Sequence, residues 1–174
     1  MSWNLYNKLI KKGYPRRDPT PIFEDKILFQ KLINDLIKPF KNQKITKVVA
    51  LDALGFILGG AIAYKLRIGL IPIRKGGKLP QEGKLKRKIS FVDYTKTKKT
   101  FEINKGLIKK SDKILLVDEW IDTGAQMKAA IKLIEKEGGK IIGISTFYAN
   151  RRNKTEILFK KYNCHAIKEV KKNS

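Results

Sequence analysis

Short buried strand patterns that alternate with helical patterns constrain the fold of this chain more than any other feature of its sequence. Apolar runs rich in Val, Ile and Leu predict buried strands at residues 45–51, 69–73, 113–117 and 141–147. Apolar residues at helical spacing predict helices between and after these strands, at residues 55–66 and 127–137. Strands that alternate with helices predict an α/β fold, with a central parallel sheet and right-handed crossovers.

The remaining segments fit around this sheet. Residues 22–40 show helical spacing that Pro39 ends, residues 154–161 predict a short helix, and residues 165–170 predict a last edge strand. Residues 74–100 have no helical period, and alternation near Ile89 and Phe91 and again over residues 100–103 predicts a hairpin with a charged, mobile tip. Because long insertions in compact domains are often functional lids, we expect a flexible lid at about residues 80–103.

Composition limits the function classes. The chain has 174 residues, the size of a single domain, with 39 Lys and Arg against 16 Asp and Glu. A net charge of +23 attracts polyanions, but the charge is spread along the chain, so we expect nucleic acid to bind only non-specifically. No apolar run approaches the length of a membrane span or a signal peptide, and the single cysteine excludes a disulfide scaffold. These features predict a cytoplasmic protein without a membrane partner.

The segment with the most chemical content is residues 114–126, ILLVDEWIDTGAQ. A buried strand leads into the adjacent carboxylates of Asp118 and Glu119, and a turn with Thr123 and Gly124 then opens into a helix. Ligands bind at the carboxyl edge of a parallel sheet, and free amides at a helix N-terminus bind anions. The pattern predicts a sugar-phosphate site, although a helix cap beside solvated acids would have the same local sequence.

This turn resembles the motif that binds phosphoribosyl pyrophosphate (PRPP) in type I phosphoribosyltransferases. Residues 45–49, 55–59 and 71–80 (IPIRKGGKLP) are similar in order and spacing to the adenine phosphoribosyltransferase family. Residues 13–15 and 22–25 resemble its N-terminal purine-covering segment. The resemblance implies the type I fold, with an N-terminal hood within residues 1–40 of a single domain spanning residues 1–174. It also implies transfer of ribose phosphate from PRPP to adenine or another purine, with Mg²⁺ and release of pyrophosphate.

The resemblance also implies roles for individual residues. It assigns ribose-phosphate binding to Asp118, Glu119, Asp122, Thr123, Gly124, Ala125 and Gln126, and pyrophosphate binding to Asp52, Ala53, Leu54, Arg74 and Lys78. Purine binding falls to Phe23, Glu24, Trp120 and Ile121, and catalysis to Asp93, Tyr94 and Asp122. Asp118 and Glu119 would hold Mg²⁺, mostly through water and PRPP. A plain core role for Trp120 and a solvated turn for Asp93 are the competing interpretations.

Three departures from the family pattern keep other functions open. Leu54 replaces an arginine, Gln126 replaces a Thr or Ser, and Asp122 stands where adenine enzymes carry a small residue and 6-oxopurine enzymes an aspartate. The alternatives are a hypoxanthine or guanine enzyme, a PRPP- or nucleotide-binding regulator without this catalysis, and a nucleic-acid-binding module. Because the family is commonly dimeric, we expect a homodimer.

Overall fold

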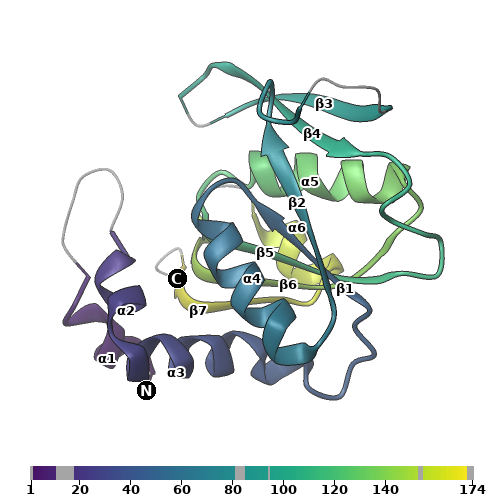
Figure 1. Cartoon of the computed structure of the whole chain (residues 1–174). Helices are drawn as coiled ribbons and strands as arrows, with labels where there is room; N and C mark the ends of the chain where they lie inside the picture. The colour runs from purple at the N-terminus through teal and green to yellow at the C-terminus, as the bar shows by residue number, and fades with distance from the viewer. Residues whose placement is uncertain (1, 11–17, 81–84, 94, 153–154, 172–174) are drawn as a thin grey trace.

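A seven-stranded sheet forms the centre of the molecule in the computed structural model, which describes residues 2–10, 18–80, 85–93, 95–152 and 155–171 (Figure 1). Its strands lie in the order β3-β4-β2-β1-β5-β6-β7. In chain order they are β1 (Lys47–Leu51), β2 (Gly69–Lys75), β3 (Lys86–Val92), β4 (Lys98–Asn104), β5 (Lys113–Ile121), β6 (Lys140–Asn150) and β7 (Cys164–Val170). The predicted strands and the predicted hairpin are therefore all present.

The sheet is mixed and mostly parallel. Strands β2, β1, β5, β6 and β7 run parallel to one another, whereas β4 pairs antiparallel with both β2 and β3. Only two residue pairs, Arg74↔Glu102 and Lys75↔Phe101, join β4 to β2. The β3–β4 hairpin thus extends the central sheet through a short junction (Figure 1).

Helices cover both faces of the sheet because successive strand residues point to opposite sides. Val48 and Leu115 pack with α1 (Ser2–Asn7), α3 (Lys26–Ile37) and α4 (Leu54–Leu66) on one face. Val49 and Leu116 pack on the other face with α5 (Ala125–Lys136) and α6 (Glu156–Lys161). No helix in the part of the chain that the structure describes is long and apolar enough to cross a membrane.

The prediction of one continuous helix over residues 22–40 is wrong. It is divided into α2 (Thr20–Glu24), α3 and a 3-10 turn, η1 (Lys38–Phe40). Asp25 separates the first two because its carboxylate accepts hydrogen bonds from the amides of Ile27 and Leu28, both at 2.9 Å, and so caps α3. The sequence pattern missed this boundary because apolar spacing continues across it.

Strand β5 is longer than the sequence predicts. The sequence pattern predicts a strand that ends at residue 117, but pairing with β6 continues through Asp118↔Thr146 and Trp120↔Tyr148. Asp118 and Glu119 therefore lie within β5, near the carboxyl end where the sequence analysis places them. This extension fixes the direction of both carboxylates, because a strand residue has a defined face.

Candidate ligand-binding site

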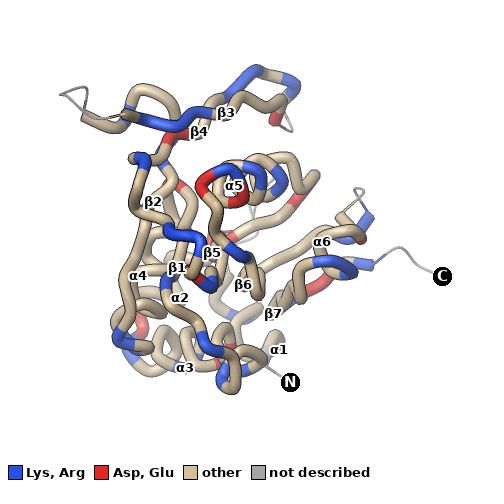
Figure 2. Tube along the Cα trace, turned by 90° about the vertical axis from the view of Figure 1, so that its right-hand side faces the viewer, with Lys and Arg blue, Asp and Glu red and all other residues tan. Residues whose placement is uncertain are grey.

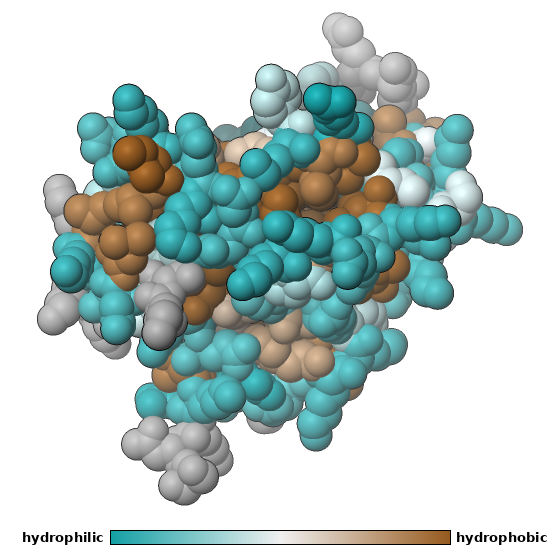
Figure 3. Space-filling view, turned by 90° about the horizontal axis from the view of Figure 1, so that it is seen from below, coloured by the Kyte–Doolittle hydropathy of each residue, from teal (hydrophilic) through white to brown (hydrophobic). Residues whose placement is uncertain are grey.

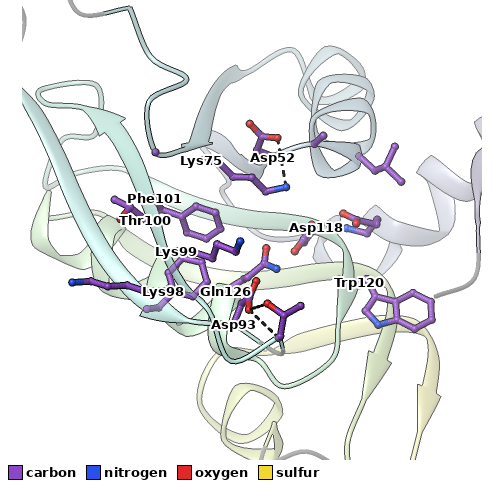
Figure 4. Close-up of a pocket in the computed structure, with 16 residues that line it drawn as sticks. Asp52, Lys75, Asp93, Lys98, Lys99, Thr100, Phe101, Asp118, Trp120 and Gln126 are labelled. Carbon is purple, nitrogen blue, oxygen red and sulfur yellow. Dashed lines mark hydrogen bonds and ion pairs between the residues drawn. The ribbon is translucent and has the colours of Figure 1, made fainter. Parts of the chain in front are cut away.

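A cavity of about 860 Å³ lies at the carboxyl ends of β1 and β5, beneath the β3–β4 hairpin (Figure 4). Five segments supply its walls: the turn between β1 and α4, the end of β2, the hairpin, the end of β5 and the first turn of α5. Its lining residues are Asp52, Ala53, Leu54, Lys75, Gly76, Phe91, Asp93, Thr95, Lys98, Lys99, Thr100, Phe101, Asp118, Glu119, Trp120 and Gln126. The carboxyl edge of the parallel strands thus meets the hairpin around one space.

Asp118 is held in a confined position at the floor of this cavity. Only 4% of Asp118 is exposed, and its Oδ1 accepts a hydrogen bond of 2.9 Å from the Glu119 amide. A Cβ atom added to Gly55 would lie 3.1 Å from the same oxygen. Glycine at position 55 therefore lets the first turn of α4 approach the Asp118 carboxylate.

The turn between β1 and α4 carries Asp52, Ala53 and Leu54, all three of which line the cavity. The Asp52–Ala53 peptide bond is cis. The carboxylate of Asp52 receives the Arg74 Nε at 3.1 Å, and the Lys75 ammonium lies 4.0 Å from its other oxygen. The Arg74 guanidinium also lies 5.7 Å from the centre of the Phe56 ring. Arg74 is thus engaged with this turn and is not among the residues that line the cavity.

The basic residues of the cavity come from positions that the sequence analysis did not single out. They are Lys75 at the end of β2 and Lys98 and Lys99 at the start of β4. Figure 2 shows Lys and Arg along much of the hairpin, so that one wall of the cavity is supplied by a basic segment. Lys78, which the resemblance favoured, is exposed and does not line the cavity.

A second, smaller recess adjoins the cavity at the start of α5. Ile121, Asp122, Thr123, Gly124 and Ala125 line it, together with Asp93, Trp120, Gln126 and Met127, which is an unbroken turn plus one hairpin residue. Gly124 caps α5 with φ of 75°, a left-handed conformation that favours glycine. The turn that begins this 12-residue helix lines the recess, and the first amides of a helix, which have no partner within it, can bind anions.

Asp93 lies at the tip of the hairpin and borders both spaces. Its Oδ1 accepts hydrogen bonds from the Thr95 amide at 2.9 Å, the Thr95 hydroxyl at 2.5 Å and the Thr97 hydroxyl at 3.2 Å. The Thr95 side chain, the largest of these influences, holds the pKa of Asp93 below its ordinary value. Asp93 is therefore ionised at neutral pH and is held in a compact polar turn.

Trp120 is partly buried at the edge of both spaces. Its ring stacks on Tyr148 of the adjacent strand, with centroids 3.8 Å apart and an angle of 11° between the planes. Trp120 also lines both the cavity and the recess, so it is not only a core residue. Tyr148 supports a flat aromatic surface beside the carboxylates of β5.

Several predicted residues do not meet the cavity. Phe23 in α2 packs on Phe29, with ring centroids 5.5 Å apart, and neither Phe23 nor Glu24 is a cavity-lining residue. Tyr94 and residues 13–15 lie outside the described residues, as do residues 81–84 of the expected lid.

The comparisons with known proteins agree with this arrangement. Residues 22–174 match the family of phosphoribosyl transferase domains. The chain is 41% identical over 132 residues to an adenine phosphoribosyltransferase of Dinoroseobacter shibae, which covers 76% of this chain and 72% of the relative. It is 43% identical over 136 residues to that of Ruegeria pomeroyi, with 75% and 71% covered.

Solved structures show the same likeness in three dimensions. The adenine phosphoribosyltransferase of Rhodothermus marinus superposes with a TM-score of 0.88 at 29% identity, over 97% of this chain and 98% of that one. The enzyme of Giardia lamblia in complex with 9-deazaadenine also gives a TM-score of 0.88, at 30% identity and with 99% of both chains covered.

Proposed function

This chain belongs to the phosphoribosyltransferase family, and from that membership we infer that it is an adenine phosphoribosyltransferase of purine salvage. The reaction transfers the 5-phosphoribosyl group of PRPP to adenine and releases pyrophosphate. The observation that carries this function is the cavity in which the acidic end of β5, an anion-binding helix start and a basic hairpin meet. The ribose hydroxyls, the 5′-phosphate and the pyrophosphate group of PRPP require these three kinds of surface, in that order.

We place the ribose phosphate at the end of β5 and the start of α5. The carboxylates of Asp118 and Glu119 accept hydrogen bonds from the two ribose hydroxyls, since both line the cavity at the edge of the recess. The amides from Thr123 to Gln126, with the Thr123 hydroxyl, bind the 5′-phosphate. Phosphate at one end of the turn and carboxylates at the other fix the sugar between them.

The purine lies beside Trp120 and Ile121 in this proposal. The Trp120 ring, backed by Tyr148, offers a flat face for the base, and aromatic stacking favours such an arrangement. Asp93 and Asp122, which both border the recess, are the acceptors that handle the purine proton. Because its hydrogen bonds keep Asp93 ionised, its carboxylate can accept a hydrogen bond from an N–H group of the base.

The pyrophosphate group of PRPP occupies the space beside the turn of Asp52, Ala53 and Leu54. Arg74 orients this turn through its ion pair with Asp52 rather than by reaching into the cavity. Negative charge develops on pyrophosphate as the glycosidic bond breaks, so positive groups placed beside it stabilise the transition state.

The donor atoms at the end of β5 fit Mg²⁺. Mg²⁺ prefers oxygen ligands and is usually bound by one or two carboxylates together with substrate phosphates and water. Asp118 and Glu119 provide adjacent carboxylates that line the cavity and would hold the ion. When bound, Mg²⁺ neutralises part of the negative charge of PRPP.

We also propose that two copies of the chain form a homodimer through the outer face of α4. This helix is apolar on all sides, as helices buried on both faces are. On its outer side Ile57 is 44% exposed and Tyr64 is 88% exposed, and Leu70 of β2 beside it is 39% exposed. Seen from below, the surface carries hydrophobic patches between hydrophilic side chains (Figure 3). A second copy that covers α4 would remove this apolar surface from water.

Formation of AMP from PRPP, adenine and Mg²⁺ tests the function. Asp118→Asn removes one ribose-binding charge, and we expect kcat/KM to fall by at least about tenfold. Asp112→Asn is the matched control, because Asp112 is similarly buried but precedes β5 at the opposite end of the strand. It should retain activity at temperatures where it stays folded.

The choice of base is tested in the same assay with hypoxanthine and guanine. We expect adenine to be the preferred acceptor. A clear preference for a 6-oxopurine would contradict the adenine function, and PRPP binding without turnover for any base would contradict catalysis.

A further inference from the structure

The cavity contains more acidic than basic groups, although the proposed substrate is a polyanion. Its acidic lining residues are Asp52, Asp93, Asp118 and Glu119, whereas its basic lining residues are Lys75, Lys98 and Lys99. The turn that faces the pyrophosphate space, Asp52 to Leu54, contains no cation of its own. Leu54 offers only an apolar side chain there, where the adenine phosphoribosyltransferase family pattern has an arginine. The positive charge for pyrophosphate must therefore come from another wall.

The three lysines differ in where their ammonium groups lie. The Lys75 ammonium lies 4.0 Å from Asp52 Oδ1 and is directed toward that carboxylate. Lys98 and Lys99 are neighbours on β4, so their side chains leave the strand on opposite sides. Figure 4 shows Lys99 directed into the cavity, toward Asp118 and Gln126, and Lys98 directed away from it.

Lys99 is also available for a ligand. Within the described part of the chain, no ion pair involves its ammonium group, in contrast to Lys88 on the paired strand, which lies 2.9 Å from the Glu102 carboxylate. The register places Lys99 opposite Phe91, and both residues line the cavity wall. Lys99 is thus an exposed cation on a strand that lies over the cavity.

We propose that Lys99 binds the pyrophosphate group of PRPP and supplies, from the hairpin, the positive charge that Leu54 does not supply from the turn between β1 and α4. This inference rests on the proposed function. Lysine is a compact charge on a flexible stem, so it reaches a phosphate without the fixed planar geometry of arginine. Because Lys99 would contact the leaving group, its charge would act most strongly as pyrophosphate separates from the sugar.

Two neighbouring variants test the assignment. Lys99→Ala should weaken binding of magnesium pyrophosphate, measured by calorimetry, and raise the KM for PRPP, each by about tenfold, the usual worth of a charge-assisted contact. Lys98→Ala removes the same charge from the adjacent residue that points away, and both quantities should change less than about twofold. Equal losses in the two variants would show a general effect of hairpin charge and overturn the assignment.

A compensating substitution distinguishes direct binding from an effect on folding. Leu54→Arg in the Lys99→Ala background restores a cation from the opposite wall, so pyrophosphate affinity should recover by several-fold or more. Lack of recovery in the folded double variant, or unchanged pyrophosphate affinity in Lys99→Ala, would overturn the proposal.

The calorimetric measurement uses pyrophosphate alone and does not depend on turnover. If wild-type protein forms no AMP but loses pyrophosphate affinity on Lys99→Ala, the proposed function fails and the Lys99 site stands. If AMP forms and Lys99→Ala is equivalent to wild type, the function stands and the Lys99 site fails.

Discussion

The side-chain amide of Asn150 donates a hydrogen bond of 3.0 Å to Asp122 Oδ1 and so joins the end of β6 to the turn after β5. The side-chain oxygen of Asn150, Oδ1, accepts a hydrogen bond of 3.0 Å from the backbone amide of Arg152. In addition, the Asn150 carbonyl accepts a hydrogen bond of 2.7 Å from the Thr155 hydroxyl. Asn150 is therefore fixed on both sides and holds the Asp122 carboxylate at the recess.

Loss of this hydrogen bond should impair the role proposed for Asp122 as an acceptor for the purine proton. In Asn150→Ala, Asp122 loses a donor worth about 1.5–3 kcal/mol, and we expect kcat to fall about tenfold or more with a smaller change in the KM for PRPP. Asn150→Asp removes the same donor and places a second carboxylate beside Asp122, so its kcat should fall at least as far as that of Asn150→Ala. A kcat within twofold of wild type in both variants would show that Asn150 has only a structural role.

Two consecutive glycines in α4 should respond oppositely to alanine. A Cβ at Gly59 would lie 2.5 Å from the Ala50 Cβ, so Gly59→Ala should lower the free energy of unfolding by about 1–3 kcal/mol. At Gly60 the nearest atom is 4.0 Å away, and Gly60→Ala should raise stability by up to about 1 kcal/mol through helix propensity. Denaturant unfolding measures both. Equal effects would mean that α4 does not pack closely on β1.

Asp112 should make stability depend on acid pH. Burial opposes its ionisation, but hydrogen bonds from the Lys47 ammonium at 2.8 Å, the Lys109 amide at 2.7 Å and the Thr46 hydroxyl at 2.9 Å together lower its pKa. A lowered native pKa means that its stabilisation is present above the unfolded value, about 3.9, and is lost as pH falls through the native value. Asp112→Asn should lower stability at neutral pH by about 1–3 kcal/mol.

The melting temperature of wild type should therefore fall more steeply than that of Asp112→Asn as the pH is lowered below about 4. Parallel curves for the two proteins would contradict a lowered native pKa for Asp112.

The proposed dimer should depend on the outer face of α4. Tyr64→Glu introduces a charge into the contact, and we expect sedimentation velocity to show a monomer where wild type sediments as a dimer. Ile27→Glu is the control, because Ile27 is 68% exposed but belongs to α3. A monomeric wild type, or dissociation by both variants, would contradict an interface on α4.

The sequence predicted the sheet well because its strands are marked by local apolar patterns. Val48 and Val49, or Leu115 and Leu116, are adjacent buried residues that face opposite cores, and this doubly buried pattern is typical of central strands. The break at Asp25 escaped prediction because one capping carboxylate ended a helix whose apolar spacing continued.

The site was less predictable because its walls come from segments distant in the chain. Asp118 and Glu119 lie in β5 and Asp122 directly follows it, so the local sequence of one strand was enough to single out this segment. Lys99 could be found only once the hairpin was placed over the cavity, and Arg74 was removed from the cavity by its ion pair with Asp52. A basic residue that directly precedes an expected hairpin strand gives no local signal of what it faces.

The β3–β4 hairpin extends the sheet beyond its parallel strands through a short junction. Part of the surface that faces the cavity therefore lies outside the parallel core. The parallel strands bury their residues on both faces, so a substitution there disturbs packing whatever its effect on ligands. The tip of the hairpin is instead exposed at residues 95–99, so its side chains can change without repacking the interior. Such a segment is a natural place for substrate preference to diverge among otherwise similar enzymes, and a transplanted hairpin would carry its lysine charges with it.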